Sequence, residues 1–279
     1  MNGSEVFADG ALAGRAVLVT GGGTGLGRAA AAELRRCGAE VVICGRREAV
    51  LAETAAELGL HHVPGDVREE DDAERILRFA LERCGRLDAL VNNAGGQYFT
   101  PAEAIEPKGW RAVTRLNVGA TERMTRLAAE LAFLPAGAGT VVNVTLSPHH
   151  GLAGMTHSSA ARAAVEGYTR ALAEEWAERG VAVIAVAAGH FDTASLRKYP
   201  EPVWRAAART VPLQRLGREE EHAWLVALCC TPLGAGLSGS VVTLDGARDN
   251  WFGPWPPGSL AGDGGDVPTE ARGPKPPGS

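Results

Sequence analysis

The sequence predicts an α/β protein with a single, doubly wound parallel sheet of about seven strands and helices on both faces. Short apolar runs rich in valine and isoleucine alternate along the chain with longer helical patterns, which is typical of repeated β-α-β units. Several runs are apolar at every position, as in VAVIAVAAG at 181–189, and this indicates strands that are buried on both faces. A glycine-rich turn joins the first apolar run to the first helical pattern. Together these features indicate one large domain.

The expected elements follow from the apolar runs taken in order. Strands are expected at 16–20 and 40–44, within 61–67 and 87–95, and at 140–145, 181–189 and 240–246. Helices are expected between them at 27–38, 47–59, 69–85 and 155–180, each of which ends at a glycine. The helix at 69–85 begins with acidic residues, which the helix dipole favours at that end.

Length and composition limit the organisation of the chain. The protein has 279 residues, 45% of them hydrophobic, which is enough for one domain over residues 1–252 with a substantial core. Glycine, proline and serine dominate residues 253–279, so we expect a partly disordered tail there. Trp251, Phe252 and Trp255 are unusual for a free tail, and we expect its first part to pack on the domain.

Charge and cysteine usage exclude several classes of protein. The net charge of −5, without a basic run, argues against a nucleic-acid partner. There is no run of about 18 apolar residues and no signal peptide, so we expect no membrane span and a cytoplasmic protein. The five cysteines are odd in number and lack metal-ligand spacing, which indicates reduced thiols and no metal site. We therefore expect a small-molecule substrate.

The turn after the first expected strand reads TGGGTGLGR over residues 20–28. Gly21, Gly25 and Gly27 permit a tight turn, close approach of the backbone to a pyrophosphate, and close packing of the helix that follows. The backbone N–H groups around Thr24 and Leu26 then face the phosphates at the helix N-terminus. Because this turn joins a strand to a helix in the first β-α unit, it predicts a Rossmann-type dinucleotide site.

The end of the second expected strand indicates which nicotinamide cofactor is bound. An acidic residue there would bind the ribose 2′-hydroxyl of NAD, whereas this chain has Arg46 and Arg47. Two guanidiniums suit a 2′-phosphate, which they can hold with paired hydrogen bonds. The helix dipole disfavours cations at a helix start, so a solvated pair without a role is the weaker interpretation. The sequence predicts NADPH.

These motifs resemble those of the short-chain dehydrogenase/reductases over roughly residues 14–246. TGGGTGLG fits the TGxxxGxG motif of that family, NNAG at 92–95 its NNAG motif, and Asn117 the asparagine of its catalytic tetrad. The resemblance implies a Rossmann-type fold and a homo-oligomer, a dimer or tetramer, built partly on the helix at 155–180. It also implies cofactor contacts from Asp66, Val67, Asn93, Ala94, Gly95, Arg162, Gly189, Phe191 and Thr193.

Two longer stretches narrow the resemblance. Residues 92–113 and 157–176 are similar to the peroxisomal-type trans-2-enoyl-CoA reductases and to the 2,4-dienoyl-CoA reductases. The cyclohexenylcarbonyl-CoA reductases, which are also enoyl reductases, are similar in outline. Citronellol-type dehydrogenases share the start of the second stretch, HSSAARA, and this similarity keeps a carbonyl or alcohol substrate open.

The sequence departs from the family at the start of the helix at 155–180. The family has a tyrosine there and a lysine four residues later, whereas this chain has Ser158 and Arg162. Tyr98, Tyr168 and Tyr199 are the three tyrosines of the chain, and none has a lysine four residues beyond it. Ser158 and Arg162 share a helix face, and Arg162 has donors enough to replace the lysine as a ribose ligand.

Other candidate catalytic groups lie close to this helix. The family's catalytic serine follows the fifth strand, where Thr145 and Ser147 are the candidates. His149 and His150 come next, and at least one of them fits a surface loop histidine. His157 directly precedes Ser158, so it is a candidate to face the substrate.

The missing tyrosine favours one reaction over another. Carbonyl reduction leaves a basic alkoxide that requires a matched acid, and serine is a poor one. Reduction of a C=C bond conjugated to a thioester delivers hydride to Cβ and leaves an enolate, which requires hydrogen-bond donors such as Ser158. The proton for Cα can come from water, His157, Tyr98 or Ser147. The sequence therefore predicts an NADPH-dependent enoyl-thioester reductase of the enoyl-CoA reductase type.

Two other functions stay open. One is an NADP-dependent carbonyl reductase or alcohol dehydrogenase that uses a non-standard acid, His157 or Tyr98. The other is a protein that binds NADPH without catalysis. The substrate is expected to meet the segment 191–216, whose arginines and Lys198 fit either a CoA phosphate or a solvated basic face.

Overall fold

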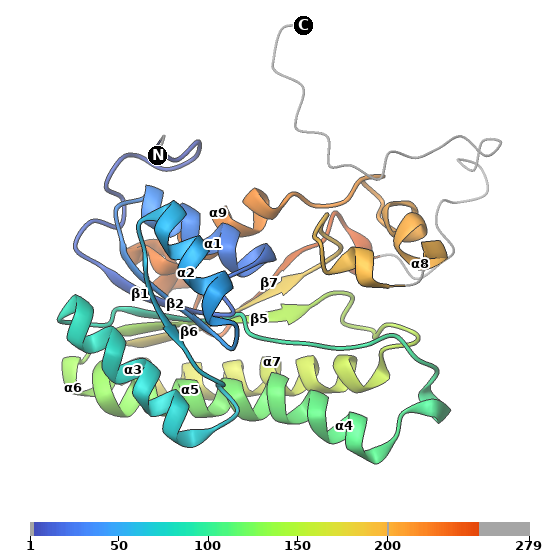
Figure 1. Cartoon of the computed structure of the whole chain (residues 1–279), viewed down its shortest axis with the longest axis horizontal. Helices are drawn as coiled ribbons and strands as arrows, with labels where there is room; N and C mark the ends of the chain where they lie inside the picture. Colours follow the sequence, from blue (N-terminus) through green and yellow to red (C-terminus); the bar gives the residue numbers. More distant parts are fainter. Residues whose placement is uncertain (1–2, 200, 251–279) are drawn as a thin grey trace, which may run out of the picture.

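The strands of the computed structural model form one parallel sheet, which has seven strands within the described residues, 3–199 and 201–250. Figure 1 shows this sheet between two layers of helices. The strand order is β3-β2-β1-β4-β5-β6-β7. The strands are β1 (Ala16–Thr20), β2 (Glu40–Gly45), β3 (His61–Pro64), β4 (Ala89–Asn92), β5 (Gly139–Leu146), β6 (Val181–Ala188) and β7 (Val241–Leu244). The predicted Rossmann-type sheet is confirmed, and the expected tail at 253–279, with Trp251, Phe252 and Trp255, lies outside the described residues.

Helices cover the sheet on both faces (Figure 1). One layer consists of α1 (Gly25–Arg36), α2 (Glu48–Leu58) and α9 (Glu219–Cys230). The other consists of α3 (Glu70–Cys84), α4 (Pro107–Thr114), α5 (Ala120–Ala128), α6 (Leu134–Ala136) and α7 (Thr156–Trp176). A short helix, α8 (Glu201–Ala206), lies apart from both layers (Figure 1).

Successive residues of each strand point to opposite layers, and this alternation builds two cores. In β1, Val17 and Val19 pack toward α1 and α9, whereas Leu18 packs toward α3. The same division separates Ile184 of β6 from its neighbour Val183. This is why a strand such as β6 is apolar at every position, as the sequence indicated. Truncation of a side chain such as Leu18, which is fully buried, is expected to destabilise the fold by about 2–5 kcal/mol.

Helix ends occur at the expected glycines. α2 ends before Gly59 and α3 before Gly85, and both glycines have positive φ, 67° and 72°, which caps a helix without a Cβ penalty. After α7 a single 3₁₀ turn, Ala177–Arg179, leads to Gly180 in the same conformation.

The sheet has a switch point at β1, where the strand order reverses. Val19 pairs with Ile43 of β2 on one side and with Val91 of β4 on the other. All the strands are parallel, so their carboxyl ends share one edge, and ligands of such sheets bind at that edge beside the switch point. The residues that follow β1, β4, β5 and β6 therefore face one crevice.

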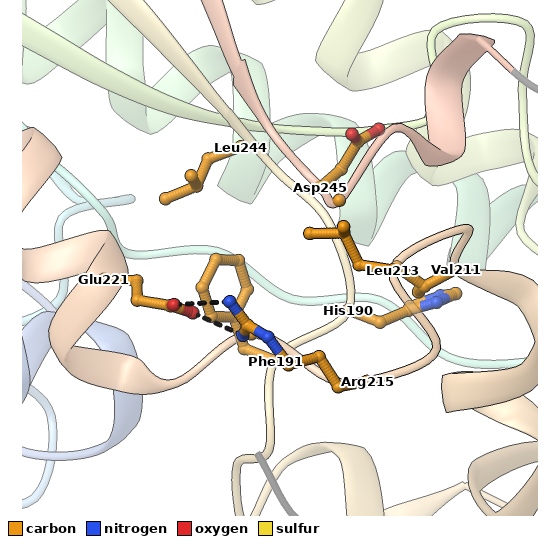
Figure 2. A pocket seen from close by; sticks show the side chains of 10 residues that line it. His190, Phe191, Val211, Leu213, Arg215, Glu221, Leu244 and Asp245 are labelled. Atoms are coloured by element: carbon orange, nitrogen blue, oxygen red, sulfur yellow. Dashed lines mark hydrogen bonds and ion pairs between the residues drawn. The ribbon is translucent and has the colours of Figure 1, made fainter. Parts of the chain in front are cut away.

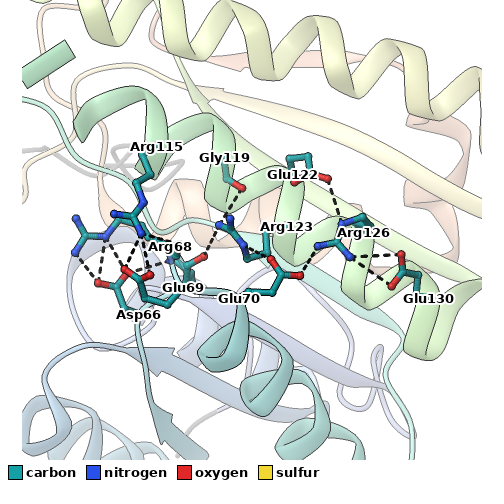
Figure 3. Close-up of polar contacts among 11 residues, drawn as sticks. Asp66, Arg68, Glu69, Glu70, Arg115, Gly119, Glu122, Arg123, Arg126 and Glu130 are labelled. Atoms are coloured by element: carbon teal, nitrogen blue, oxygen red, sulfur yellow. Dashed lines mark hydrogen bonds and ion pairs between the residues drawn. The ribbon is translucent and has the colours of Figure 1, made fainter. Parts of the chain in front are cut away.

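An ion-pair network joins α3 to α5 on the outside of this edge. Figure 3 shows Glu70 at the start of α3 between two arginines of α5, at 2.6 Å from Arg123 Nε and 2.5 Å from Arg126 Nη2. These hydrogen bonds hold the pKa of the Glu70 carboxyl below its usual range. Just before α5, Arg115 bonds Glu69 at 2.8 Å. The network fixes the segment that carries Asn117.

Among the described residues, no helix has the length and apolar character that a membrane crossing requires.

Candidate active site

The glycine-rich turn after β1 has the geometry of a phosphate-binding loop. Gly21 and Gly25 have positive φ, 68° and 54°, which side chains rarely adopt. Gly27 is in close contact, since a Cβ there would overlap the Asn93 amide nitrogen and the Gly21 carbonyl oxygen. Thr24 precedes α1 in an extended conformation and Leu26 lies in its first turn, so the free N–H groups of this helix start face the crevice. A dinucleotide pyrophosphate fits this loop.

Thr20 ties the loop to the end of β4. Its hydroxyl accepts hydrogen bonds from the backbone N–H groups of Asn93, at 3.0 Å, and Ala94, at 2.9 Å. The Asn93 side chain donates in turn to the Thr20 carbonyl at 2.9 Å. These bonds hold the NNAG turn directly beside the glycine-rich turn. Sequence analysis expected cofactor contacts from both turns, and the structure places them next to each other.

Behind this turn, buried amides join β4, β5 and α7. The Asn92 amide donates to Thr125 Oγ1 and to Asn143 Oδ1, both at 2.9 Å. The Asn143 amide donates to Thr169 Oγ1 of α7, also at 2.9 Å. All four side chains are buried, so each bond is expensive to leave unmade. The chain of amides fixes α7 against the sheet.

Two arginines without partners lie at the end of β2. Arg46 and Arg47 are exposed, and neither side chain forms a hydrogen bond or ion pair with a described residue. Asp66, at the end of β3, is held by Arg68, whose Nη2 is 2.5 Å from its carboxylate (Figure 3). Arg68 first, and Arg46 to a smaller extent, keep the pKa of Asp66 below its usual range. Val67 follows Asp66 and is buried.

Asn117 lies in a π-helical turn, Arg115–Gly119, between α4 and α5. Its amide donates to the carbonyls of Gly96 and Val113, both at 2.8 Å, and its oxygen accepts from the Gly96 N–H at 3.2 Å. The side chain is fully buried, and a Cβ on Gly95 would press on its oxygen. Asn117 therefore shapes the 95–96 backbone at the end of β4.

Arg162 projects from α7 into the same region. Its Nη1 donates to the Val144 carbonyl at 2.7 Å, and its Nη2 lies where a Cβ on Gly95 would be. Its Nε is buried and has no partner among the described residues, and no described carboxylate forms an ion pair with the guanidinium. Burial lowers the pKa of Arg162 to about 10. An unused donor on a buried cation fits a ribose hydroxyl or an anionic oxygen.

Ser158 lies one turn earlier on α7 and is fully buried. Its hydroxyl donates to Gln97 Oε1 at 3.4 Å, and the Gln97 amide donates to the Tyr199 hydroxyl at 3.2 Å. Neither Gln97 nor Tyr199 was predicted from the sequence as a site residue. Tyr199 lacks the lysine four residues beyond it that the family's motif requires. The three groups come from the loop after β4, the first turn of α7 and the segment after β6.

His157 is fully buried beside Ser158. Neither ring nitrogen has a partner among the described residues, and the ring packs against Tyr98 at a centroid distance of 4.5 Å. Burial lowers the pKa of His157. The neutral form is therefore favoured, and a neutral imidazole is a poor proton donor.

The candidate hydroxyls at the end of β5, Thr145 within the strand and Ser147 just after it, are engaged by carboxylates. Thr145 donates to Glu166 of α7 at 2.9 Å, and Ser147 donates to Asp245. His149 lies between carboxylates, with Nε2 at 3.2 Å from Glu166 and Nδ1 at 2.5 Å from Asp249. Within the described part of the chain, neither Thr145 nor Ser147 contacts Ser158 or Arg162 through a hydrogen bond.

The segment after β6 forms the remaining wall. A Cβ on Gly189 would overlap Asp245, so the chain passes close to the end of β7 there. Phe191 is buried, and Thr193 Oγ1 accepts from the Leu196 N–H at 3.2 Å. Figure 2 shows a pocket of about 70 Å³ behind this segment, lined in part by His190 and Phe191. It is too small for an acyl thioester.

Comparison with known proteins agrees with this geometry. The family model described as short chain dehydrogenase matches residues 15–203. The chain belongs to the short-chain dehydrogenase family. Members of this family are oxidoreductases that bind NAD or NADP, which agrees with the glycine-rich turn.

Several short-chain dehydrogenases are similar over most of this chain. The probable 2,4-dienoyl-CoA reductase of Bacillus subtilis is 35% identical over 253 residues, which cover 87% of this chain and 98% of that protein. The 3-hydroxyacyl-CoA dehydrogenase type-2 of Drosophila melanogaster is 36% identical over 250 residues, covering 82% and 95%. The structure of the citronellol catabolism dehydrogenase of Pseudomonas aeruginosa PAO1 matches with a TM-score of 0.79 and 34% identity, covering 88% and 98%. The resemblance to the dienoyl-CoA reductase subgroup is confirmed.

Proposed function

We propose that this short-chain dehydrogenase is an NADPH-dependent reductase of the C=C bond of a 2-enoyl thioester. The observation that carries the proposal is Ser158, which stands where the family has its catalytic tyrosine. Ser158 is buried and bonds Gln97, so α7 itself offers a neutral hydrogen-bond donor at the position of the family's tyrosine. That arrangement suits an enolate, which requires hydrogen bonds more than an immediate proton.

The residues present fit the cofactor. The turn at Gly21–Gly27 would hold the pyrophosphate, because Gly21 and Gly25 adopt positive φ and the N–H groups at the start of α1 are free. No carboxylate among the described residues forms an ion pair with Arg46 or Arg47, so both guanidiniums can bind the 2′-phosphate of NADPH. The unpartnered Nε of Arg162 suits a ribose hydroxyl of the nicotinamide half. When bound, NADPH supplies a hydride for Cβ.

The chain's own residues act on the charge that develops at the thioester oxygen. The Ser158 hydroxyl can turn from Gln97 to this oxygen, and the Gln97 amide offers a second donor beside it. One such donor is expected to stabilise the transition state by roughly 3 kcal/mol, or about 10²–10³ in rate. The cation of Arg162, which no described carboxylate neutralises by an ion pair, adds a favourable potential.

The similarity to dienoyl-CoA reductases is compatible with the same site. A 2,4-dienoyl thioester extends the conjugated system by one double bond, and hydride addition at its far end leaves the charge on the same thioester oxygen. The donors around Ser158 would therefore serve both substrates, and the acyl chain alone would differ.

Reduction of a 3-oxoacyl thioester is a second candidate function. The relatives include the 3-hydroxyacyl-CoA dehydrogenase type-2 of Drosophila melanogaster, named above, and the Synechocystis 3-oxoacyl-[acyl-carrier-protein] reductase, which is 33% identical over 245 residues. Such a reaction needs an acid for the alkoxide. The first turn of α7 offers Ser158 and the neutral His157 in place of the family's tyrosine, and neither of these two is a well-matched acid.

The decisive experiment compares matched substrates. The purified protein is assayed for NADPH oxidation with 2-enoyl-CoA, 2,4-dienoyl-CoA and 3-oxoacyl-CoA of the same chain length, and for NADP⁺ reduction with the 3-hydroxyacyl-CoA. We expect turnover of the enoyl or dienoyl substrates and no alcohol oxidation. Turnover of the 3-oxoacyl and 3-hydroxyacyl pair alone would replace the proposal by the second candidate.

A further inference from the structure

Tyr199 brings a phenol to the first turn of α7 from a distant part of the chain. Its hydroxyl lies 3.2 Å from the Gln97 amide nitrogen, which donates to it, and 3.6 Å from the sulfur of Met155. Gln97 is also the acceptor of the Ser158 hydroxyl. The phenol therefore belongs to the same cluster of groups as Ser158, although Tyr199 and Ser158 are 41 positions apart in the sequence.

The proton of Tyr199 has no strong acceptor. Among residues 3–199 and 201–250, its O–H donates to the Met155 thioether alone, and a thioether is a weak acceptor. Buried phenols usually find an oxygen or nitrogen partner. Tyr199 is only partly buried, so solvent can reach it. The hydroxyl is held in place by Gln97 while its proton stays available.

The position of the ring is fixed by packing. Tyr199 and Trp204 pack on the small apolar cluster formed by Leu196, Ala207, Ala208 and Leu216. The phenol is thus anchored to the segment between β6 and α9, which sequence analysis expected to meet the substrate.

Arg162 lies one turn beyond Ser158 on α7, and Ser158 is linked to the phenol through Gln97. The Arg162 guanidinium is buried without an ion pair in the described part of the chain, and burial lowers its pKa to about 10. Charge on Tyr199 acts in the opposite direction and raises this pKa, so a negative charge on the phenol oxygen and the guanidinium would stabilise each other. In the family that the chain belongs to, the phenol and the cation share one helix. Here the cation is on α7 and the phenol is supplied by the segment after β6.

We propose that Tyr199 is the proton donor of the enoyl reduction. This inference rests on the function proposed above. The electron pair of the enolate forms a C–H bond at Cα with the proton of the Tyr199 hydroxyl, whose O–H bond breaks. The positive charge of Arg162 favours the phenolate that remains, and a proton from water restores the phenol. Ser158 and Gln97 meanwhile hold the thioester oxygen.

The test is Tyr199→Phe, which keeps the ring and its packing but removes the proton. A general acid contributes roughly 10²–10⁴ in rate, so we expect kcat with a 2-enoyl-CoA to fall at least about 100-fold. KM for the enoyl-CoA, and the Kd of NADPH measured by fluorescence, are expected to stay within about twofold, because no binding contact is lost. The solvent deuterium isotope effect on kcat is expected to rise, since water must now deliver the proton.

Tyr168→Phe is the matched control. Tyr168 is on α7, packs on the core, and is expected to leave kcat unchanged. A wild-type kcat in Tyr199→Phe, or a large loss in Tyr98→Phe in its place, would overturn the inference. A wild-type protein that reduces no enoyl or dienoyl thioester would instead overturn the proposed function, whatever the variant does. Circular dichroism and thermal unfolding of each variant distinguish loss of the proton donor from loss of the fold.

Discussion

Replacing Arg46 and Arg47 by alanine removes the two guanidiniums at the carboxyl end of β2. Both are exposed and neither is engaged in an ion pair with a described residue, so the free protein loses no side-chain hydrogen bond or ion pair to the described residues when they are removed. A charge-assisted hydrogen bond from an exposed guanidinium to a phosphate is expected to contribute about 1–2 kcal/mol, between the values for exposed ion pairs and for buried charged hydrogen bonds. About 1.4 kcal/mol corresponds to a factor of ten in Kd. Each single variant should therefore bind NADPH roughly 5- to 30-fold more weakly.

NADH serves as the internal control, because it lacks the 2′-phosphate. Fluorescence titration should give nearly the same Kd for NADH in the wild type and in both variants, and the loss for NADPH should shrink at high salt. Arg170→Ala, which removes an exposed charge from α7, should change neither Kd. If NADPH and NADH weaken together, or if neither changes, the assignment of the 2′-phosphate to Arg46 and Arg47 is wrong.

Three single substitutions, at Ser158, Gly27 and His222, give further predictions. Ser158→Ala should lower kcat with an enoyl thioester about tenfold or more, because one donor to the thioester oxygen is lost; an unchanged kcat would remove Ser158 from the site. Gly27→Ala should abolish NADPH binding in the same titration, because its Cβ would overlap the Asn93 amide and the Gly21 carbonyl; a wild-type Kd would contradict the close contact. His222 is fully buried, and burial lowers its pKa from 6.5 to about 4, so the proton binds more readily to the unfolded chain. The stabilisation by neutral His222 is therefore fully present above pH 6.5. The free energy of unfolding falls as the pH drops toward 4, by about 2 kcal/mol near pH 5. His222→Leu should reduce this loss of stability, measured by urea unfolding above pH 6.5 and near pH 5. An unchanged pH dependence would show that the ring is not buried in the neutral form.

The fold was predictable because burial on both faces leaves a direct trace in the sequence. β6 is apolar at every position, and β1 at every position but its last, since each strand meets a helix layer on either side. Helix ends were predictable where a glycine takes a left-handed conformation, as at Gly59 and Gly85. The tight glycine-rich turn after β1 was predictable because its glycines are local in sequence.

The arrangement of groups around Ser158 was harder to predict from the sequence, because it depends on contacts between distant segments. Gln97 and Tyr199 are 102 residues apart, and nothing in either neighbourhood indicates that the amide and the phenol meet. The candidate hydroxyls Thr145 and Ser147 were chosen by their position after β5. No sequence motif indicates that carboxylates on α7 and after β7 bind them. Such partners become visible only once the sheet order is known.

The most direct test of the central claim follows an isotope from the cofactor into the product. The protein is incubated with a 2-enoyl-CoA and NADPH carrying deuterium at the transferred position of C4, and the product is examined by mass spectrometry and NMR. The proposed function predicts a saturated acyl-CoA with one deuterium at Cβ and one solvent proton at Cα. Recovery of unreacted enoyl-CoA, while a 3-oxoacyl-CoA gains deuterium at its carbinol carbon, would contradict it.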